Sequence, residues 1–228
     1  MTDVRAVIAA VASGFTEFDF NPPRRRPDGP LGWPGYGDSL ARARERTGEL
    51  DSVVSGRGKI GDREAVLIAF DFRFFGGSIG DLTGLRISEA FHRAAIAELP
   101  VVSLIASGGS RMQEGMRSLR QLQRIAGART GHNEGFAHIA VLRNPTTGGI
   151  WAALGAGADV IIGVEGAQVG FGGSRVRPPD LAGHPAYTAE DQLASGQVDE
   201  VVAGSSLREV LAPCFAHEVG WGRGSYSA

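Results

Sequence analysis

The chain has 228 residues, 43% of them hydrophobic and 21% charged, as in one soluble globular domain. Its formal net charge of −2 excludes the basic excess that would attract nucleic acid or an anionic membrane. Cys214 is the only cysteine, which excludes an internal disulfide and a cysteine zinc cluster. Because no apolar run could span a bilayer and no leader pattern is found, we expect a cytoplasmic protein.

The N-terminal part predicts a helix followed by an irregular arm. Residues 2–11 have the spacing of a short amphipathic helix, whereas residues 20–36 contain five prolines and three consecutive arginines. We therefore expect an N-terminal helix and arm over residues 1–37 and one main domain over residues 38–228. The arginine run is interpreted as solvent-exposed surface, with an acidic partner or a ligand phosphate as the alternative.

The rest of the chain alternates short strands and helices, which predicts a single α/β domain. The strands are expected over residues 52–55, 65–72, 101–106, 139–142, 160–164, 168–171 and 198–202. The helices are expected over residues 38–47, 82–98, 112–128, 149–156, 188–195 and 206–215. The run at 101–106 is apolar throughout, as expected of a strand that is buried on both faces.

Two glycine pairs, Gly108-Gly109 and Gly148-Gly149, each lie between an apolar strand and a helix. Such a turn leaves backbone N–H groups unpaired at a helix N-terminus, where negative charge is favoured. Two turns that face one cavity would hold a developing oxyanion, which indicates chemistry on a thioester or another carbonyl. The triplet Gly-Gly-Ser also occurs three times, at residues 76–78, 108–110 and 172–174, consistent with glycine turns on one side of the fold.

Two other glycine motifs have different interpretations. Residues 56–61 match G-x-G-x-x-G, but a strand-like segment follows, so a hairpin turn is expected in place of a dinucleotide site. Residues 76–80 match G-x-S-x-G, which leaves Ser78 as an alternative acyl-transfer nucleophile with Asp159 or Asp180 and His184 or His217. The five histidines show no metal-ligand spacing, and Arg111 and Glu114 are expected to brace the turn that precedes them.

Seven stretches of the sequence together resemble the carboxyltransferase subunits of biotin-dependent acyl-CoA carboxylases, above all the bacterial beta type. They occur in the family's order and span residues 31–202. The stretches are Thr47-Gly48 with Asp51, then residues 56–58, 71–80, 106–115, 144–149, 170–176 and 196–202.

The resemblance implies a crotonase-like superhelix of β-β-α units, in which backbone N–H groups stabilise the enolate of an acyl thioester. It implies a catalytic role for Gly108, Gly109, Gly148 and Gly149. It also implies that substrate, CoA and biotin contact Gly76, Gly77, Ser78, Ser107, Arg111, Thr147, Phe171, Gly172 and Gly173. In this family carboxybiotin releases carbon dioxide, the biotin ureido oxygen takes the α-proton, and the enolate captures the carbon dioxide.

The departures from the family pattern shape the expected partners. The family's four-cysteine zinc ribbon is missing, so no zinc is expected, and Ser110 stands where the family favours alanine. Residues 130–137 are unlike the family, and Gly173-Ser174 replaces Gly-Pro.

The sequence ends soon after the beta-like half, so we expect an oligomer with an alpha-like carboxyltransferase subunit and a biotin carrier protein. The alternatives are a biotin-independent acyl-CoA decarboxylase and a non-catalytic scaffold subunit.

Overall fold

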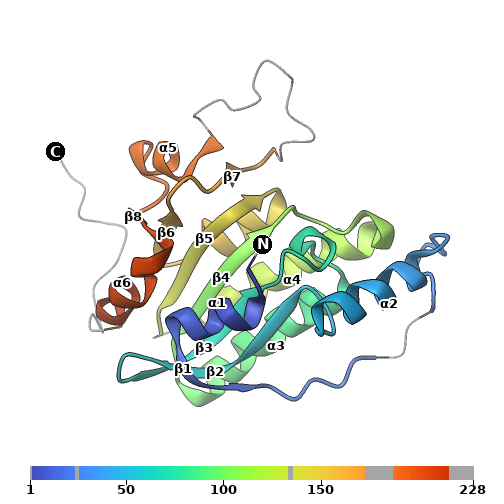
Figure 1. The fold of residues 1–228 in the computed structure, drawn as a ribbon, viewed down its shortest axis with the longest axis horizontal. Helices are drawn as coiled ribbons and strands as arrows, with labels where there is room; N and C mark the ends of the chain where they lie inside the picture. The colour runs from blue at the N-terminus through green and yellow to red at the C-terminus, as the bar shows by residue number, and fades with distance from the viewer. Residues whose placement is uncertain (1, 24–25, 133–135, 173–186, 216–228) are drawn as a thin grey trace.

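A computed structural model of the protein describes residues 2–23, 26–132, 136–172 and 187–215. Figure 1 shows one twisted sheet with helices on both faces, which confirms the α/β class. The strands are β1 (Ser13–Glu17), β2 (Val53–Ile60), β3 (Arg63–Phe70), β4 (Val101–Ser107), β5 (His138–Thr147), β6 (Val160–Val164), β7 (Val169–Gly170) and β8 (Glu200–Val202). The main helices are α1 (Val4–Val11), α2 (Tyr36–Thr47), α3 (Asp81–Ala97), α4 (Met116–His132), α5 (Ala189–Ala194) and α6 (Leu207–Cys214). Short helical turns are η1 (Phe75–Gly77), η2 (Met112–Glu114), η3 (Trp151–Gly155) and η6 (Gly204–Ser206).

The sheet runs in the order β1-β2-β3-β4-β5-β6-β8, and β7 pairs with the end of β5. The first three strands are antiparallel, whereas β3, β4, β5, β6 and β8 are parallel. Consecutive parallel strands are joined through helices, so their carboxyl ends lie at one edge of the sheet. That edge is where ligands of open α/β sheets bind.

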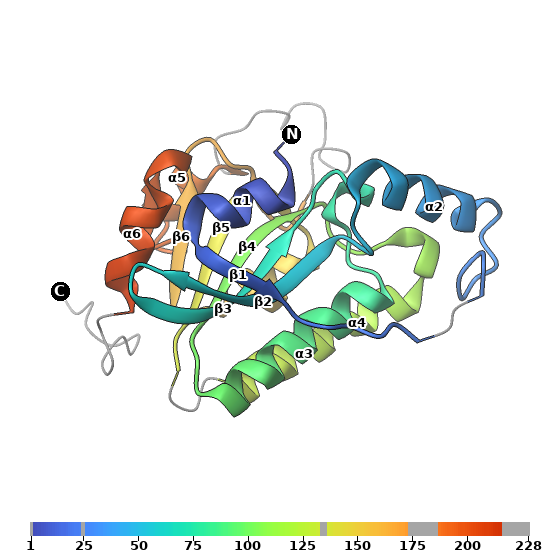
Figure 2. The same cartoon turned by 60° about the horizontal axis from the view of Figure 1, so that its bottom comes forward.

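The core forms two apolar layers, one on each face of the sheet. Figure 2 shows α3 and α4 on one face and α1 on the other. The first layer contains side chains such as Ile68, Phe91 and Ile105, and the second contains Ile8, Leu67 and Leu104. Every residue of β4 is buried, as its apolar run predicts. Within the described residues, no helix is both long and apolar enough to cross a bilayer.

The hairpin predicted for the G-x-G-x-x-G motif is confirmed. Strands β2 and β3 pair antiparallel in continuous register, with Ile60 opposite Arg63 and Gly61 in the left-handed region at φ 58°. Strand β1 was not predicted; its residues are mostly exposed and pair with β2 at the sheet edge. This strand joins residues 13–17 to the same sheet as the main domain, and the boundary at residue 37 stays a prediction.

Strand β5 is longer than β4 at the edge that carries the glycine turns. Ile105 pairs with Leu142 and Ser107 with Thr146, so three residues of β5 stand opposite one residue of β4. The hydroxyl of Thr146 donates to the carbonyl of Ile105 at 3.2 Å and holds the end of β5 against β4. The bulge therefore displaces the end of β5 while keeping it paired.

His138 is buried at the start of β5. Its Nε2 lies 2.9 Å from the Ser103 hydroxyl, and its Nδ1 has no hydrogen-bond partner. Burial disfavours the imidazolium, and the nearby Arg129 cation adds to this, so the pKa of His138 falls to about 3.

We predict that this histidine makes the fold sensitive to acid. Unfolding restores an ordinary pKa of about 6.5, so the unfolded chain binds the proton first as the pH falls. The free energy of unfolding should fall by about 1.4 kcal/mol per pH unit between about pH 6 and pH 4 from this residue. Urea denaturation of wild type and His138→Gln at several pH values measures how the free energy of unfolding depends on pH in each. If the two plots of this free energy against pH run parallel, the prediction is wrong.

Candidate active site

Three glycine turns follow three neighbouring parallel strands at one edge of the sheet. Gly76 and Gly77 follow β3, Gly108 and Gly109 follow β4, and residues 148–149 follow β5. The prediction that the glycine-rich turns gather on one side of the fold is confirmed for these three.

The second and third turns are in direct contact. A Cβ atom placed on Gly148 would lie 3.3 Å from the Cα of Gly109, and a Cβ on Gly109 would lie 3.5 Å from the carbonyl oxygen of Thr147. Gly109 and Gly148 have φ values of 102° and 77°, which L side chains rarely adopt. The structure therefore brings together the two glycine pairs that were predicted to share one cavity.

The first turn supports the second through backbone hydrogen bonds. The Gly108 N–H donates to the Gly76 carbonyl at 2.9 Å, and the Ile79 N–H donates to the Gly109 carbonyl at 2.8 Å. Gly77 has a φ of 64°, and any Cβ there would collide with the carbonyl oxygen of Ala106. A glycine is needed at this position because the two chains approach so closely.

The hydrogen bonds separate the amides of these turns into two groups. Those of Gly108 and Gly148 donate to the carbonyls of Gly76 and Gly170 at 2.9 and 3.0 Å. The Gly109 amide donates to the Ser107 hydroxyl at 3.1 Å. In the described parts of the chain, the amides of Ser110 and Gly149 have no acceptor. These two N–H groups are therefore available to an oxygen from outside the chain.

The other predicted contact residues lie around these turns. Ser107 and Thr147 are buried, and the Thr147 hydroxyl donates to the Ser107 carbonyl at 3.3 Å. Phe171 is 70% exposed just beyond β7. Gly172 follows it and is partly buried, whereas Gly173 lies outside the described residues.

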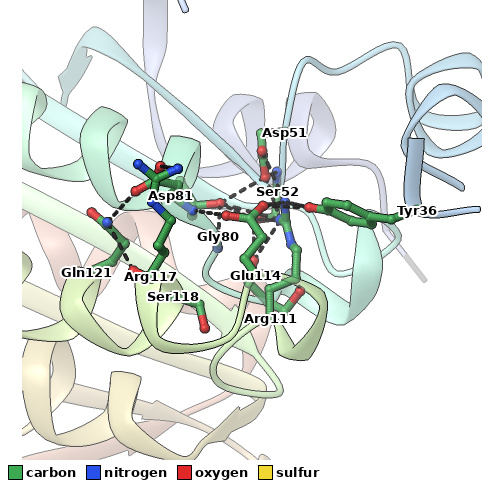
Figure 3. A network of polar contacts seen from close by, with 12 residues as sticks. Tyr36, Asp51, Ser52, Gly80, Asp81, Arg111, Glu114, Arg117, Ser118 and Gln121 are labelled. Atoms are coloured by element: carbon green, nitrogen blue, oxygen red, sulfur yellow. Dashed lines mark hydrogen bonds and ion pairs between the residues drawn. The ribbon is translucent and has the colours of Figure 1, made fainter. Parts of the chain in front are cut away.

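Arg111 and Asp51 form a buried ion pair beside the first two turns (Figure 3). Their side chains are 0% and 1% exposed, and Nη2 of Arg111 donates to Oδ1 of Asp51 at 2.5 Å. The same Nη2 donates to the Ser78 carbonyl at 2.8 Å, and the backbone N–H of Arg111 donates to the Ile79 carbonyl at 2.9 Å. One arginine thus fastens residues 78–79 to its own segment through both backbone and side chain. Because its guanidinium is enclosed by protein groups, we assign Arg111 to positioning the turns.

The ion pair stays charged over the ordinary pH range. Burial opposes ionisation of Asp51, but the adjacent Arg111 guanidinium outweighs it and lowers the pKa of Asp51 to about 2. Burial also opposes the charge on Arg111, yet its carboxylate partner raises the pKa of the guanidinium above its usual value. Thr83 and the Ser52 N–H complete the coordination of Asp51 at 2.8 and 2.7 Å.

Tyr36 and Glu114 extend this network to α2 and α3. The Tyr36 hydroxyl donates to Oε1 of Glu114 at 2.5 Å, and the Asp81 N–H at the start of α3 donates to Oε2 at 2.6 Å. Any Cβ on Gly80 would lie 2.7 Å from both the Arg111 Nη1 and the Glu114 Oε1. Sequence reasoning missed Tyr36, which it placed in the arm, and Asp51, whose partner lies 60 residues away.

The Ser78 hydroxyl has no histidine beside it among the described residues. It accepts a hydrogen bond from Nε of Arg111 at 3.2 Å, and a guanidinium cannot serve as its base. Asp159, one proposed triad member, accepts from the His138 N–H at the opposite end of β5. His184, Asp180 and His217 lie outside the described residues.

We predict that Arg111→Lys loosens both turns. Lysine keeps the positive charge, but its ammonium group cannot donate to the Asp51 carboxylate and the Ser78 carbonyl together. This loss should lower the free energy of unfolding by about 3 kcal/mol. Amide hydrogen exchange at residues 108–111 should quicken by roughly tenfold. Arg86→Lys is the matched control, because Arg86 is also buried and pairs with Glu17 at 2.6 Å, and neither residue bonds to Arg111. Equal exchange at residues 108–111 in the two variants would contradict the assignment.

Comparisons with known proteins agree with this arrangement. The sequence matches the carboxyl transferase domain family over residues 35–204. It is 41% identical over 183 residues to the acetyl-coenzyme A carboxylase carboxyl transferase subunit beta of Rubrobacter xylanophilus, covering 78% of this chain and 71% of that protein. The same subunit of Clostridium botulinum, strain Loch Maree, is 36% identical over 207 residues, with coverages of 87% and 69%.

Solved structures with the same fold are also carboxyltransferases and a decarboxylase. Transcarboxylase 12S superposes with a TM-score of 0.78 at 22% identity, covering 100% of this chain and 43% of that chain. The Pseudomonas malonate decarboxylase MdcD-MdcE hetero-dimer gives 0.73 at 22% identity, with coverages of 96% and 88%. These likenesses confirm the expected crotonase-like fold. From the match over residues 35–204 and the identity to the beta subunits, the chain belongs to the carboxyl transferase family, as a beta-like carboxyltransferase subunit.

Proposed function

We propose that the chain is the beta-like half of a biotin-dependent acyl-CoA carboxyltransferase that converts acetyl-CoA to malonyl-CoA. Its curated relatives are named as carboxyl transferase beta subunits of acetyl-coenzyme A carboxylase. The observation that carries the proposal is the pair of unpartnered amides, Ser110 and Gly149, on two glycine turns in contact. Both follow neighbouring parallel strands of one sheet, so a rigid scaffold holds them.

These amides fit the thioester oxygen of an acyl-CoA. Removing the α-proton places negative charge on that oxygen, and preorganised N–H groups stabilise it without changing their own protonation. The carboxyl group would come from biotin held on a carrier protein, which also supplies the group that accepts the α-proton. The role of this chain is then to orient the thioester, stabilise the enolate and exclude water at the turns.

A test should displace one amide without removing it. We predict that Gly109→Ala lowers the carboxylation rate by roughly 100-fold, because alanine is strained at φ 102° and shifts the Ser110 amide. The assay follows malonyl-CoA formed from acetyl-CoA by the full chain with its partner, in the presence of carboxybiotin.

The control is Gly166→Ala, also at positive φ, 68°, with no atom within 4 Å of the added Cβ. Both variants should lose similar folding stability, about 1–2 kcal/mol, but only the first should lose activity. Equal activity losses would refute the role of the turn. Turnover without biotin would favour the decarboxylase alternative, and activity unaffected by Gly109→Ala would favour the scaffold alternative.

We propose that an alpha-like half covers an apolar strip beside the turns. The strip consists of Leu31, Met112, Met116 and Leu119, which are 46–73% exposed. It is continuous with the turns, since Leu122 packs where a Cβ of Gly149 would lie and Leu31 packs against Gly115. An exposed apolar patch of this kind marks an interaction site.

Charges around the strip indicate the chemistry of the partner. The exposed charged side chains of α4 are Arg117, Arg120 and Arg124, and α4 contains no carboxylate. The covering surface should therefore be apolar at its centre and acidic at its rim.

We predict that Met116→Asp reduces copurification of the alpha-like subunit at least tenfold, because a charge is buried in the contact. The full-length chain is expressed with a tag in its native cell, and the partner is identified by peptide mass. Ile96→Asp is the control, since Ile96 is 71% exposed at the far end of α3 and Met116 is 69% exposed. A partner retained by Met116→Asp, or lost equally in both variants, would refute the surface.

A further inference from the structure

The hydroxyl of Ser110 differs from its neighbours at the glycine turns because it has no structural task. The Ser107 hydroxyl accepts from the Gly109 amide at 3.1 Å. The Thr146 and Thr147 hydroxyls donate to carbonyls of β4 at 3.2 and 3.3 Å. Within the described residues, the Ser110 hydroxyl makes no hydrogen bond, and the residue is only partly buried. This side chain is therefore available to a ligand, as its own amide is.

The backbone around Ser110 fixes the direction of that amide. Ser110 and Ile79 form an isolated parallel bridge. In it the Ile79 N–H donates to the Gly109 carbonyl at 2.8 Å, and the Arg111 N–H donates to the Ile79 carbonyl at 2.9 Å. In this bonding pattern the amide of the central residue points away from the neighbouring chain. Because β4 lies between β3 and β5, the Ser110 amide points to the side of the third glycine turn.

Covalent geometry keeps the hydroxyl of a serine close to its own amide. In two of the three staggered rotamers, Oγ is gauche to the backbone nitrogen and lies about 3 Å from it. A ligand oxygen that accepts from the Ser110 N–H at about 2.9 Å can then accept from the Ser110 hydroxyl as well. The backbone does not have to move, so the rigid turn presents both donors to one oxygen.

We infer that the Ser110 side chain is a catalytic donor to the thioester oxygen, in addition to the Ser110 and Gly149 amides. Negative charge develops on that oxygen as the enolate forms, and a hydrogen bond to a charged oxygen is stronger than one to a neutral carbonyl. The hydroxyl should therefore stabilise the transition state more than the bound substrate, and so raise kcat. This inference rests on the proposed function, because that proposal supplies the thioester.

The variant Ser110→Ala tests the inference, because it keeps the amide and removes only the hydroxyl. Alanine is the residue that the carboxyltransferase pattern favours here, so the variant should still work, but more slowly. We predict that kcat falls roughly tenfold while KM for acetyl-CoA stays constant. The assay follows malonyl-CoA formed by the full chain with its partner and carboxybiotin.

Two further variants separate the hydrogen bond from other effects. Ser110→Cys keeps the size of the side chain, but a thiol is a weak donor, so kcat should fall as in Ser110→Ala. Ser88→Ala is the matched control, since Ser88 is also partly buried and its hydroxyl donates to the Gly84 carbonyl within α3 at 2.9 Å. This control should leave kcat and KM unchanged.

Decarboxylation of malonyl-CoA gives a second measurement that needs no biotin. When the bond to the carboxylate breaks, carbon dioxide leaves and the electron pair stays on the thioester as the same enolate. Water then protonates the α-carbon to give acetyl-CoA. Ser110→Ala should slow this reaction by the same factor of roughly ten.

The outcomes distinguish the serine role from the proposed function. If wild type carboxylates acetyl-CoA and Ser110→Ala changes kcat by less than twofold, the serine role is refuted and the function stands. If wild type only decarboxylates malonyl-CoA without biotin, and Ser110→Ala slows that reaction tenfold, the serine role stands and the function is refuted. An equal loss in Ser88→Ala, or a wild-type rate in Ser110→Cys, would also refute the serine role.

Discussion

The buried ion pair between Arg111 and Asp51 holds the candidate site together. Two charges removed from water are stable only when the pair is close and its remaining donors and acceptors are satisfied. Here Ser52, Ser78 and Thr83 supply those contacts from three separate segments. Satisfying the pair therefore fixes the start of α3, the first glycine turn and the segment after β4 relative to one another. The proposed chemistry depends on this rigidity, because backbone amides stabilise charge only where they are held in place.

Glycines at the site serve steric purposes as well as conformational ones. Gly80 leaves room for the guanidinium and carboxylate groups, and Gly84 lets α3 approach the Gln121 side chain on α4. Neither residue has a positive φ, so the reason for glycine is contact distance. The dense packing around Arg111 thus depends on missing side chains in α3 as much as on the charged ones.

Local patterns in the sequence predicted a large part of the fold. The apolar run of β4 and the stop at Gly48 after α2 are strong local signals, and the structure contains both. Strand β1 was not predicted, because an exposed edge strand lacks the alternation of apolar and polar residues that indicates a strand. The glycine pairs indicated an oxyanion site, but which amides stay unpaired depends on partners such as Gly76 and Gly170, which tertiary contacts supply. The same applies to Arg111, whose charge is visible in the sequence while its burial is not.

The bulge in β5 constrains the number of residues in this part of the strand more than it constrains which residues they are. Residues 143–145 stand opposite a single residue of β4, and Thr146 and Thr147 then bind β4 through their hydroxyls. Successive side chains of a strand point to opposite faces, so losing or gaining one residue would exchange the directions of the two threonines. Substitutions in the bulge should accordingly be tolerated during divergence, whereas single-residue insertions and deletions there should be eliminated by selection.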